Sequence, residues 1–345
     1  MKNKIFLITG GSGGHLFPAI SLSENEKTFD YYFLIDQRVE KIIQTKKLKY
    51  FKIFSASISI NILLPIKLAK IILGFFQSIF LFIKYKPQLV VGFGGYTTIP
   101  SILAAKILRI KIIIHEQNSV MGKTNRILSS LTKYIALTFK NTKYAKRHSI
   151  HTGIPIRKKQ NKKYRKSNLK RIFVVGGSQG AKIFSELVPK LIENFSRVSK
   201  TKLIIIQQVR KEDIGLTVNS YKRMKVKSIV KIFFDDIYDQ FDKADLIISR
   251  CGSSTLAEIE LYNKFSVLFP LPSATNNHQY FNAIEFKKNN QCLICDERTI
   301  NFSKTSKEIE KIVFKKKLHK IELSKKLSHK LSLLNFIKKT LVEDA

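Results

Sequence analysis

The chain has few cysteines for its length. Its 345 residues contain three, too few for a disulfide framework. Cys292 and Cys295 form a C-x-x-C pair inside an apolar run. Without a second pair of ligands this run is interpreted as a buried strand rather than a metal or redox site, and we expect neither metal nor cofactor. The first residues enter an apolar strand directly, so we expect no signal peptide and synthesis in the cytosol.

Acidic residues are also scarce. There are 25 Asp and Glu against 62 Lys and Arg, which gives a formal net charge of +37. A composition rich in Lys, Ile, Asn and Phe throughout explains part of this charge, and attraction to an anionic membrane surface remains open. Nucleic-acid binding ranks last, because no recognisable module accompanies the charge, and we expect no nucleic-acid partner.

No apolar run is long enough to span a bilayer. The run from Ile71 to Ile83 is shorter than the ~20 residues that a membrane helix needs, and Lys67 and Lys70 occupy the stretch that could extend it. We expect a helix over 66–83 that either lies on a membrane surface or packs as a core helix. In the first case the membrane contacts are Phe75, Phe76, Ile79 and Phe80.

Short apolar runs alternate with helical stretches, which is typical of doubly wound α/β domains. The length suits two domains. The predicted strands of the first half are 4–9, 31–35, 50–54, 88–92, 111–115, 133–138 and 150–152. Those of the second half are 171–175, 202–207, 228–232, 246–249, 266–269 and 291–294. The basic run 157–170 is the predicted linker, and the C-terminal ~40 residues have the apolar spacing of a solvated amphipathic helix or helix pair.

Two of the predicted strands end in glycine-rich loops that precede helical runs. The loops are 10–15 (GGSGGH) and 176–180 (GGSQG). Such corners direct unpaired amides and a helix dipole at one point, which suits phosphate. Neither is a P-loop or a dinucleotide fingerprint. The second loop matches the nucleophile elbow of α/β-hydrolases, and Ser178, Asp245 and His278 follow one another in the order of a hydrolase triad. This alternative is disfavoured, because the first loop repeats the pattern without triad partners.

Further polar clusters follow predicted strands at the same edge of each sheet. They are 92–96, 115–118, 153–157, 249–255 and 277–279. A cleft between two domains that is rich in amide pockets of phosphate size indicates a nucleotide-diphosphate ligand.

Together, segments 10–15, 92–96, 115–118, 177–180, 250–258 and 278–283 resemble the motif set of the MurG family, glycosyltransferases of family 28 with the GT-B fold. The motifs follow the family's order. The resemblance implies two Rossmann-like α/β domains with parallel sheets. The first, 1–157, faces the acceptor and the membrane; the second, 158–328, binds UDP-GlcNAc; and the last helix, 329–345, packs back on the first.

The activity implied by the resemblance is inverting transfer of GlcNAc from UDP-GlcNAc to the MurNAc 4-hydroxyl of lipid I, which gives lipid II for peptidoglycan. No metal is obligatory. The alternative is another GT-B enzyme that uses a UDP-sugar, such as a glycolipid synthase or a UDP-GlcNAc 2-epimerase. The implied location is peripheral, on the cytoplasmic face of the inner membrane, with a cell-wall and division complex as a candidate partner.

His15 is the candidate general base, because imidazole titrates near working pH and a helix start keeps it neutral. The resemblance places the acceptor diphosphate at Gly94, Gly95 and Tyr96. The implied UDP-GlcNAc-binding residues are Ser12, Gly13, Gly14, Asn118, Arg157, Ser178, Phe234, Ser253, Ser254, Thr255, Glu258 and Gln279. Ser12 stands where the family commonly has Thr, and Asn276-Asn277 where it often has an acidic residue. His115 is interpreted as a packed structural histidine.

Overall fold

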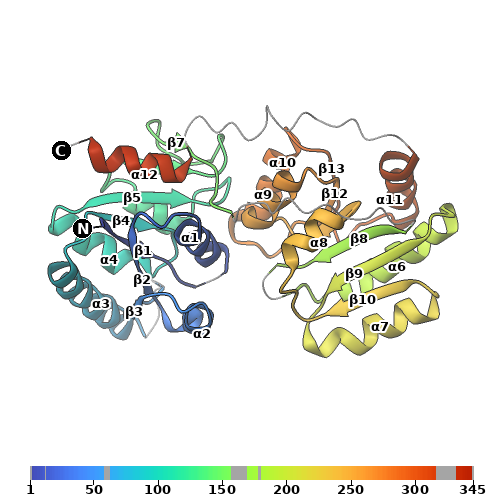
Figure 1. The fold of residues 1–345 in the computed structure, drawn as a ribbon, viewed down its shortest axis with the longest axis horizontal. Helices are drawn as coiled ribbons and strands as arrows, with labels where there is room; N and C mark the ends of the chain where they lie inside the picture. The colour runs from blue at the N-terminus through green and yellow to red at the C-terminus, as the bar shows by residue number, and fades with distance from the viewer. Residues whose placement is uncertain are drawn as a thin grey trace. The chain divides into compact units, whose positions relative to one another are not determined.

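The computed structural model of this chain describes residues 2–11, 13–57, 63–156, 169–177, 180–315 and 332–343. Contacts divide the chain into two compact units, one of residues 1–158 and 328–345 and the other of residues 159–327. Figure 1 shows a sheet with helices on its faces in each unit. The linker prediction 157–170 falls mostly outside the described residues.

The first unit is built on a parallel sheet whose strand order is β3-β2-β1-β4-β5-β6-β7. Its strands are β1 (Lys4–Ile8), β2 (Asp30–Ile35), β3 (Tyr50–Lys52), β4 (Leu89–Gly92), β5 (Lys111–Glu116), β6 (Tyr134–Leu137) and β7 (Ile150–His151). Its helices are α1 (Gly13–Asn25), η1 (Gln37–Val39), α2 (Glu40–Thr45), α3 (Leu64–Tyr85), α4 (Thr98–Ile107), α5 (Lys123–Leu128) and α12 (Leu333–Val342).

The second unit repeats this order with β10-β9-β8-β11-β12-β13, also parallel. Its strands are β8 (Lys170–Val175), β9 (Leu203–Gln208), β10 (Lys227–Lys231), β11 (Leu246–Ser249), β12 (Ser266–Leu268) and β13 (Cys292–Ile294). Its helices are α6 (Phe184–Val198), η2 (Lys211–Asp213), α7 (Ile214–Arg223), α8 (Ile237–Lys243), α9 (Ser253–Tyr262), η3 (Thr275–Asn277), α10 (His278–Lys287), α11 (Phe302–Ile309) and η4 (Glu310–Lys315). Every predicted strand is confirmed within two residues at each end, including the strand that holds Cys292.

Alternation along the strands decides which helices cover which face. In β1, Ile5 and Leu7 pack in one core with α1 and α12, whereas Phe6 and Ile8 pack in another with α3 and α4. Both faces are buried because successive side chains of a strand point to opposite sides. Each strand of the sheet is therefore a continuous apolar run in the sequence, and the polar residues lie in the loops at the carboxyl edge.

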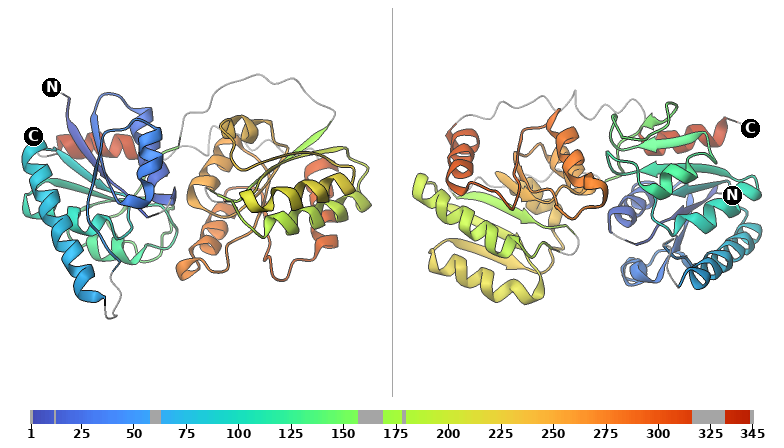
Figure 2. Two further views of the ribbon diagram at one scale, coloured as in Figure 1. Left: turned by 90° about the horizontal axis from the view of Figure 1, so that it is seen from below. Right: turned by 180° about the vertical axis from the view of Figure 1, so that it is seen from behind.

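The C-terminal helix α12 packs on the first unit, although the second unit precedes it in the chain (Figures 1 and 2). Phe336 and Ile337 are buried in the core that contains α1 and β1. The Lys111 ammonium donates to the carbonyls of Thr340 and Leu341 at 2.9 and 3.2 Å. A cation on the last carbonyls of a helix stabilises its C-terminal end.

Helix α3 is apolar on almost every side, and by length and composition it could cross a membrane. It nevertheless packs on α4 and the sheet: Phe82 is buried, and Ser78 Oγ lies 2.8 Å from Ser101 Oγ. Phe75 and Ile79 are partly buried against the same core, whereas Phe76 and Phe80 are 62% and 63% exposed. The four predicted membrane contacts thus divide between two faces of the helix.

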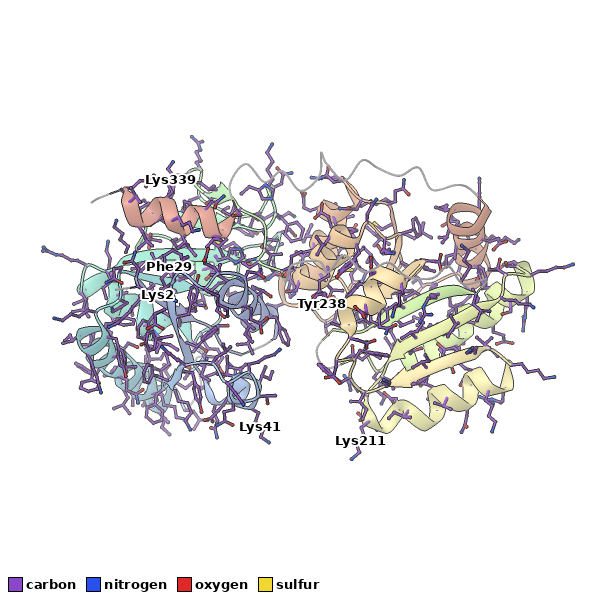
Figure 3. All side chains as sticks on the ribbon, viewed as in Figure 1. Lys2, Phe29, Lys41, Lys211, Tyr238 and Lys339 are labelled. Atoms are coloured by element: carbon purple, nitrogen blue, oxygen red, sulfur yellow. The ribbon has the colours of Figure 1, made fainter. Side chains whose placement is uncertain are left out.

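The excess positive charge is spread over the surfaces of both units. In Figure 3, Lys41, Lys211 and Lys339 project from three different elements, α2, η2 and α12. All three side chains are exposed. These three positions agree with a lysine-rich composition throughout the chain.

Candidate active site

His15 lies in the first turn of α1, at the carboxyl edge of the first sheet. The glycine loop after β1 brings the chain directly into this helix, so the imidazole is partly buried beside the loops that follow β4 and β5. Its Nδ1 is 2.8 Å from Oε1 of Gln117, which follows β5. One edge of the ring is thereby held, and Nε2 is on the opposite edge.

The loop after β4 lies against that opposite edge of the imidazole. Gly94 and Gly95 have φ of +94° and +76°, a region that disfavours other residues. A Cβ on Gly94 would lie 3.2 Å from His15 Cε1, and one on Gly95 would lie 3.8 Å from His15 Nε2. Glycine is favoured here by the positive φ at both positions and, at Gly94, by the close approach of the backbone to the ring.

A cluster of charged and aromatic groups borders the first glycine loop. Asp36, after β2, accepts from Arg38 at 2.5 Å and from the Thr97 hydroxyl at 2.8 Å. The Arg38 guanidinium lies 4.5 Å above the Tyr96 ring, and a Cβ on Gly11 would lie 2.9 Å from its Nη2. A half-exposed guanidinium held in place beside a glycine loop is suited to a phosphate oxygen.

The loop after β5 is ordered by a buried carboxylate. Glu116 is 1% exposed and accepts from the backbone amides of Asn118 and Gly122 and from the Asn125 side chain, at 2.9, 3.0 and 2.8 Å. These bonds satisfy the carboxylate. They also keep Asn118 partly exposed at the sheet edge, where the resemblance places a sugar contact.

In the second unit, the helices after β11 and η3 meet around Gln279. Its Oε1 accepts from the backbone amides of Cys251 and Leu271, each at 3.1 Å. Asn282, one turn further along α10, donates to the Cys251 carbonyl at 3.1 Å. Because Gln279 Oε1 already accepts from two backbone amides, Nε2 is the atom of this side chain that can donate a hydrogen bond to a ligand.

Helix α9 begins at Ser253, immediately after β11 and the Gly252 N-cap. Its first-turn amides have no partner within the helix. Ser254 Oγ is buried and, within the part of the chain that the structure describes, has no hydrogen-bond partner. Glu258 is partly exposed one turn further on and accepts from the Tyr238 hydroxyl at 3.3 Å. The start of α9 thus carries backbone amides, the hydroxyls of Ser253, Ser254 and Thr255, and the carboxylate of Glu258.

Phe234 is 3% exposed and its ring packs edge-to-face on Phe173, within the core. Its contact with UDP-GlcNAc stays a prediction. The hydrolase alternative is wrong: Asp245 accepts from Lys170 and the Arg171 amide at the amino end of β11. Strand β8 runs parallel to β11 and ends at Val175, at the opposite edge of the sheet, and Ser178, which lies outside the described residues, comes after that end in the sequence.

Several predicted site residues lie outside the described part of the chain, namely Ser12, Arg157 and Ser178. Gly13 and Gly14 are described as the first residues of α1. Sequence reasoning missed Arg38 and the role of Gln117. Arg38 could have been found from its position, because Asp36 and Arg38 directly follow the predicted strand 31–35. Gln117 lies inside the polar segment 115–118, which the sequence had already indicated.

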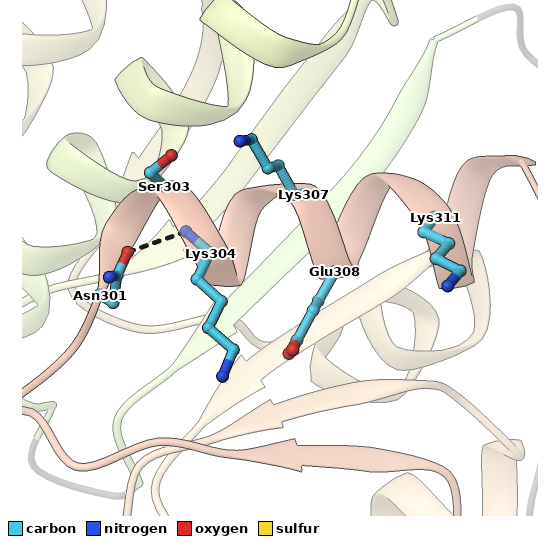
Figure 4. A pocket seen from close by; sticks show the side chains of 6 residues that line it. All are labelled: Asn301, Ser303, Lys304, Lys307, Glu308 and Lys311. Atoms are coloured by element: carbon cyan, nitrogen blue, oxygen red, sulfur yellow. Dashed lines mark hydrogen bonds between the residues drawn. The ribbon is translucent and has the colours of Figure 1, made fainter.

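A hollow of about 420 Å³ lies on the exposed side of α11, remote in sequence from these loops (Figure 4). It is lined by Asn301, Ser303, Lys304, Lys307, Glu308 and Lys311. Asn301 caps the helix through the Lys304 amide at 2.9 Å. All of these residues come from one continuous helical segment, whereas ligand sites in such folds use loops from several strands. Among the described residues, no group of three or more His, Cys, Asp or Glu could hold a metal ion.

Two doubly wound domains with the same strand order, each with polar loops after its central strands, define a protein of the GT-B class. The glycosyltransferase family 28 N-terminal domain matches residues 5–137 and the C-terminal domain of that family matches residues 171–337. The chain therefore belongs to glycosyltransferase family 28, which confirms the resemblance.

Curated relatives extend over nearly the whole chain. The UDP-N-acetylglucosamine–N-acetylmuramyl-(pentapeptide) pyrophosphoryl-undecaprenol N-acetylglucosamine transferase of Rickettsia canadensis is 37% identical, covering 98% of this chain and 99% of its own. The enzyme of the same name from Rickettsia bellii is 37% identical over 91% and 92%. The crystal structure of Acinetobacter baumannii MurG has a TM-score of 0.73 at 25% identity, with 90% of each chain covered.

Proposed function

We propose that this protein transfers GlcNAc from UDP-GlcNAc to the MurNAc 4-hydroxyl of lipid I and so produces lipid II for peptidoglycan. The observation that carries the proposal is His15: its Nδ1 is held by Gln117 and its opposite edge lies against the Gly94–Gly95 loop. The names of the two Rickettsia relatives, at 37% identity, supply the substrates.

The first unit would bind the acceptor. The amides of Gly94 and Gly95 and the guanidinium of Arg38 border the same glycine loop, and together they suit the diphosphate of lipid I. Tyr96 fixes Arg38 by stacking beneath it. Binding the diphosphate here would bring the acceptor sugar next to the His15 imidazole.

The second unit would bind UDP-GlcNAc. The first turn of α9 offers amides that have no partner within the helix and the Ser254 hydroxyl, which has no partner among the described residues. Glu258 is suited to the two ribose hydroxyls because a carboxylate can accept from both. Gln279 would donate through Nε2 to a sugar hydroxyl. Gly177 and Gly180 border the second glycine loop with φ of +88° and +70°, where a diphosphate would approach the backbone.

The proposed reaction uses these groups of the two units. His15 Nε2 removes the proton of the 4-hydroxyl as its oxygen forms a bond to C1 of GlcNAc. The bond from C1 to the UDP oxygen breaks on the opposite face, so the configuration inverts. The negative charge of departing UDP is stabilised by helix-start amides. We infer no metal step.

The exposed face of α3 would attach the protein to the cytoplasmic surface of the inner membrane. Ile72, Phe76, Phe80 and Ile83 are each more than half exposed. Lys84 lies 5.9 Å from the Phe80 ring centroid, so an ammonium borders the apolar face. Rings in the acyl boundary with lysines at the headgroups are typical of peripheral attachment. A cell-wall and division complex stays a prediction from the resemblance.

The test is transfer of labelled GlcNAc from UDP-GlcNAc to a lipid I analogue by wild type, His15→Ala and His148→Ala. His148 is an exposed histidine of the same unit and serves as the matched control. We expect a loss of at least about 10²-fold in kcat for His15→Ala only, with UDP-GlcNAc binding retained. A folded wild type that binds UDP-GlcNAc but modifies a different acceptor, or isomerises the sugar, would refute the proposal in favour of another GT-B enzyme.

A further inference from the structure

A chain of hydrogen bonds runs from His15 into the core of the first unit. His15 Nδ1 is 2.8 Å from Gln117 Oε1, and Gln117 Nε2 is 2.9 Å from Nδ1 of His115. Nε2 of His115 is 3.0 Å from the carbonyl oxygen of Gly153, which follows β7. This series of hydrogen bonds thus connects residues that follow β1, β5 and β7 or lie at their ends. It ends at the Gly153 carbonyl, a group that can only accept.

The orientation of the Gln117 amide is determined by a second backbone carbonyl. Gln117 Nε2 is also 2.9 Å from the carbonyl oxygen of His115. An amide oxygen in that position would face another oxygen, so the NH₂ group must be there. Gln117 Oε1 therefore faces His15, and the contact requires a proton on His15 Nδ1.

The state of His115 agrees with this orientation from the other end. Because its Nε2 faces the Gly153 carbonyl, Nε2 carries the proton and Nδ1 is the acceptor for the second Gln117 N–H. His115 is fully buried, and burial lowers its pKa to about 4. The ring is therefore neutral at working pH, as the acceptor role of Nδ1 requires.

We infer that Gln117, held by His115, is a positioning residue that locks His15 in its Nδ1-protonated tautomer and leaves the Nε2 lone pair facing the Gly94–Gly95 loop. The inference deepens the proposed function, because it rests on His15 as the base. When Nε2 takes the acceptor proton, Nδ1–H stays bonded to Gln117 Oε1 and the amide dipole stabilises the imidazolium. No proton moves along the chain, because an amide cannot pass it on.

The direct test is the tautomer of His15 in the wild-type protein, without substrate. Nitrogen-15 NMR of the protein labelled at histidine distinguishes a protonated from an unprotonated ring nitrogen, and His15→Gln assigns the signals by their disappearance. We expect a protonated Nδ1 and an unprotonated Nε2 at pH 7.5. The opposite pattern, or a mixture of both tautomers, would overturn the inference. This measurement needs no folded Gln117 variant.

Variants of Gln117 test the consequence for transfer. Gln117→Leu keeps the size of the side chain but cannot hold Nδ1–H. We expect mixed tautomers and the loss of a hydrogen bond to the imidazolium, which together lower kcat by about 10- to 10²-fold. The KM for UDP-GlcNAc should not change, since Gln117 is 1% exposed and is not itself among the expected UDP-GlcNAc contacts. Gln117→Glu, protonated in this buried position, retains an acceptor oxygen and a donor, and should restore much of the kcat.

The outcomes separate this inference from the proposed function. If Gln117→Leu keeps full kcat and a single Nδ1-protonated tautomer, the inference fails while His15 remains the base. If His15→Ala retains transfer, the proposed base fails, and the tautomer measurement still reports whether Gln117 orients the ring. A loss of kcat in Gln117→Leu that Gln117→Glu does not relieve, without a tautomer change, would indicate a merely structural role and overturn the inference.

Discussion

Removing the two most exposed phenylalanine rings of α3 should release the protein from membranes without unfolding it. The change is the double variant Phe76→Ser/Phe80→Ser. Both rings project from the face of α3 opposite to its core contacts, which include Phe82 and Ser78. The Phe76 ring does contact the partly buried Phe75, with ring centroids 5.3 Å apart, so the double variant should lower the free energy of unfolding by no more than about 1 kcal/mol.

The size of the effect follows from the exposed area. The rings are 62% and 63% exposed. Burying a whole Phe side chain contributes roughly 1.5–3 kcal/mol, so the exposed part of each ring contributes about 1–2 kcal/mol on insertion. Losing both weakens vesicle binding by about 2–4 kcal/mol, which is roughly 30- to 700-fold.

The assay is sedimentation with vesicles of phosphatidylglycerol and phosphatidylethanolamine at physiological salt. Phe233→Ser is the matched control, since Phe233 is 63% exposed but lies in the second unit. Its binding should equal that of wild type. If the double variant still binds like wild type while its thermal unfolding is unchanged, the assignment of α3 as the membrane face is refuted. If Phe233→Ser is released as well, the attachment does not depend on α3 alone.

Two further predictions concern stability. Burial lowers the pKa of His115 to about 4 from 6.5, so the unfolded chain binds a proton that the native state does not. The contribution of neutral His115 to the free energy of unfolding should be fully present above pH 6.5 and should be lost as the pH falls toward 4, by on the order of 3 kcal/mol. Urea titrations at several pH values should therefore show a smaller change of this free energy with pH for His115→Phe than for wild type. The same pH dependence in both proteins would contradict the assignment. On α3, a Cβ at Gly74 would lie 1.9 Å from the Phe54 carbonyl oxygen, so Gly74→Ala should lower the free energy of unfolding by about 1–2 kcal/mol. The control Gly215→Ala, whose Cβ meets nothing within 4 Å, should raise it by up to about 1 kcal/mol, and the same sign for both would refute the packing argument.

Much of this protein could be predicted from the order of its residues. The strands were recognisable because both faces of a parallel sheet are buried, which makes each strand a short apolar run between polar loops. The repeat of a strand, a glycine loop and a helix indicated two similar domains. Since the carboxyl ends of parallel strands meet at one edge, the loops that follow them were expected to form the site.

The tertiary structure alone decided how single side chains are used. The sequence could not divide the apolar residues of α3 between core and surface, because that helix is apolar on almost every side and only its packing on α4 and the sheet separates Phe75 from Phe76. His15 and Gln117 are 102 residues apart, and the orientation of the Gln117 amide depends on a backbone carbonyl and a buried ring that no local pattern records. Composition and periodicity report average burial along a strand or helix, whereas hydrogen-bond direction depends on atoms that only folding brings within about 3 Å of one another.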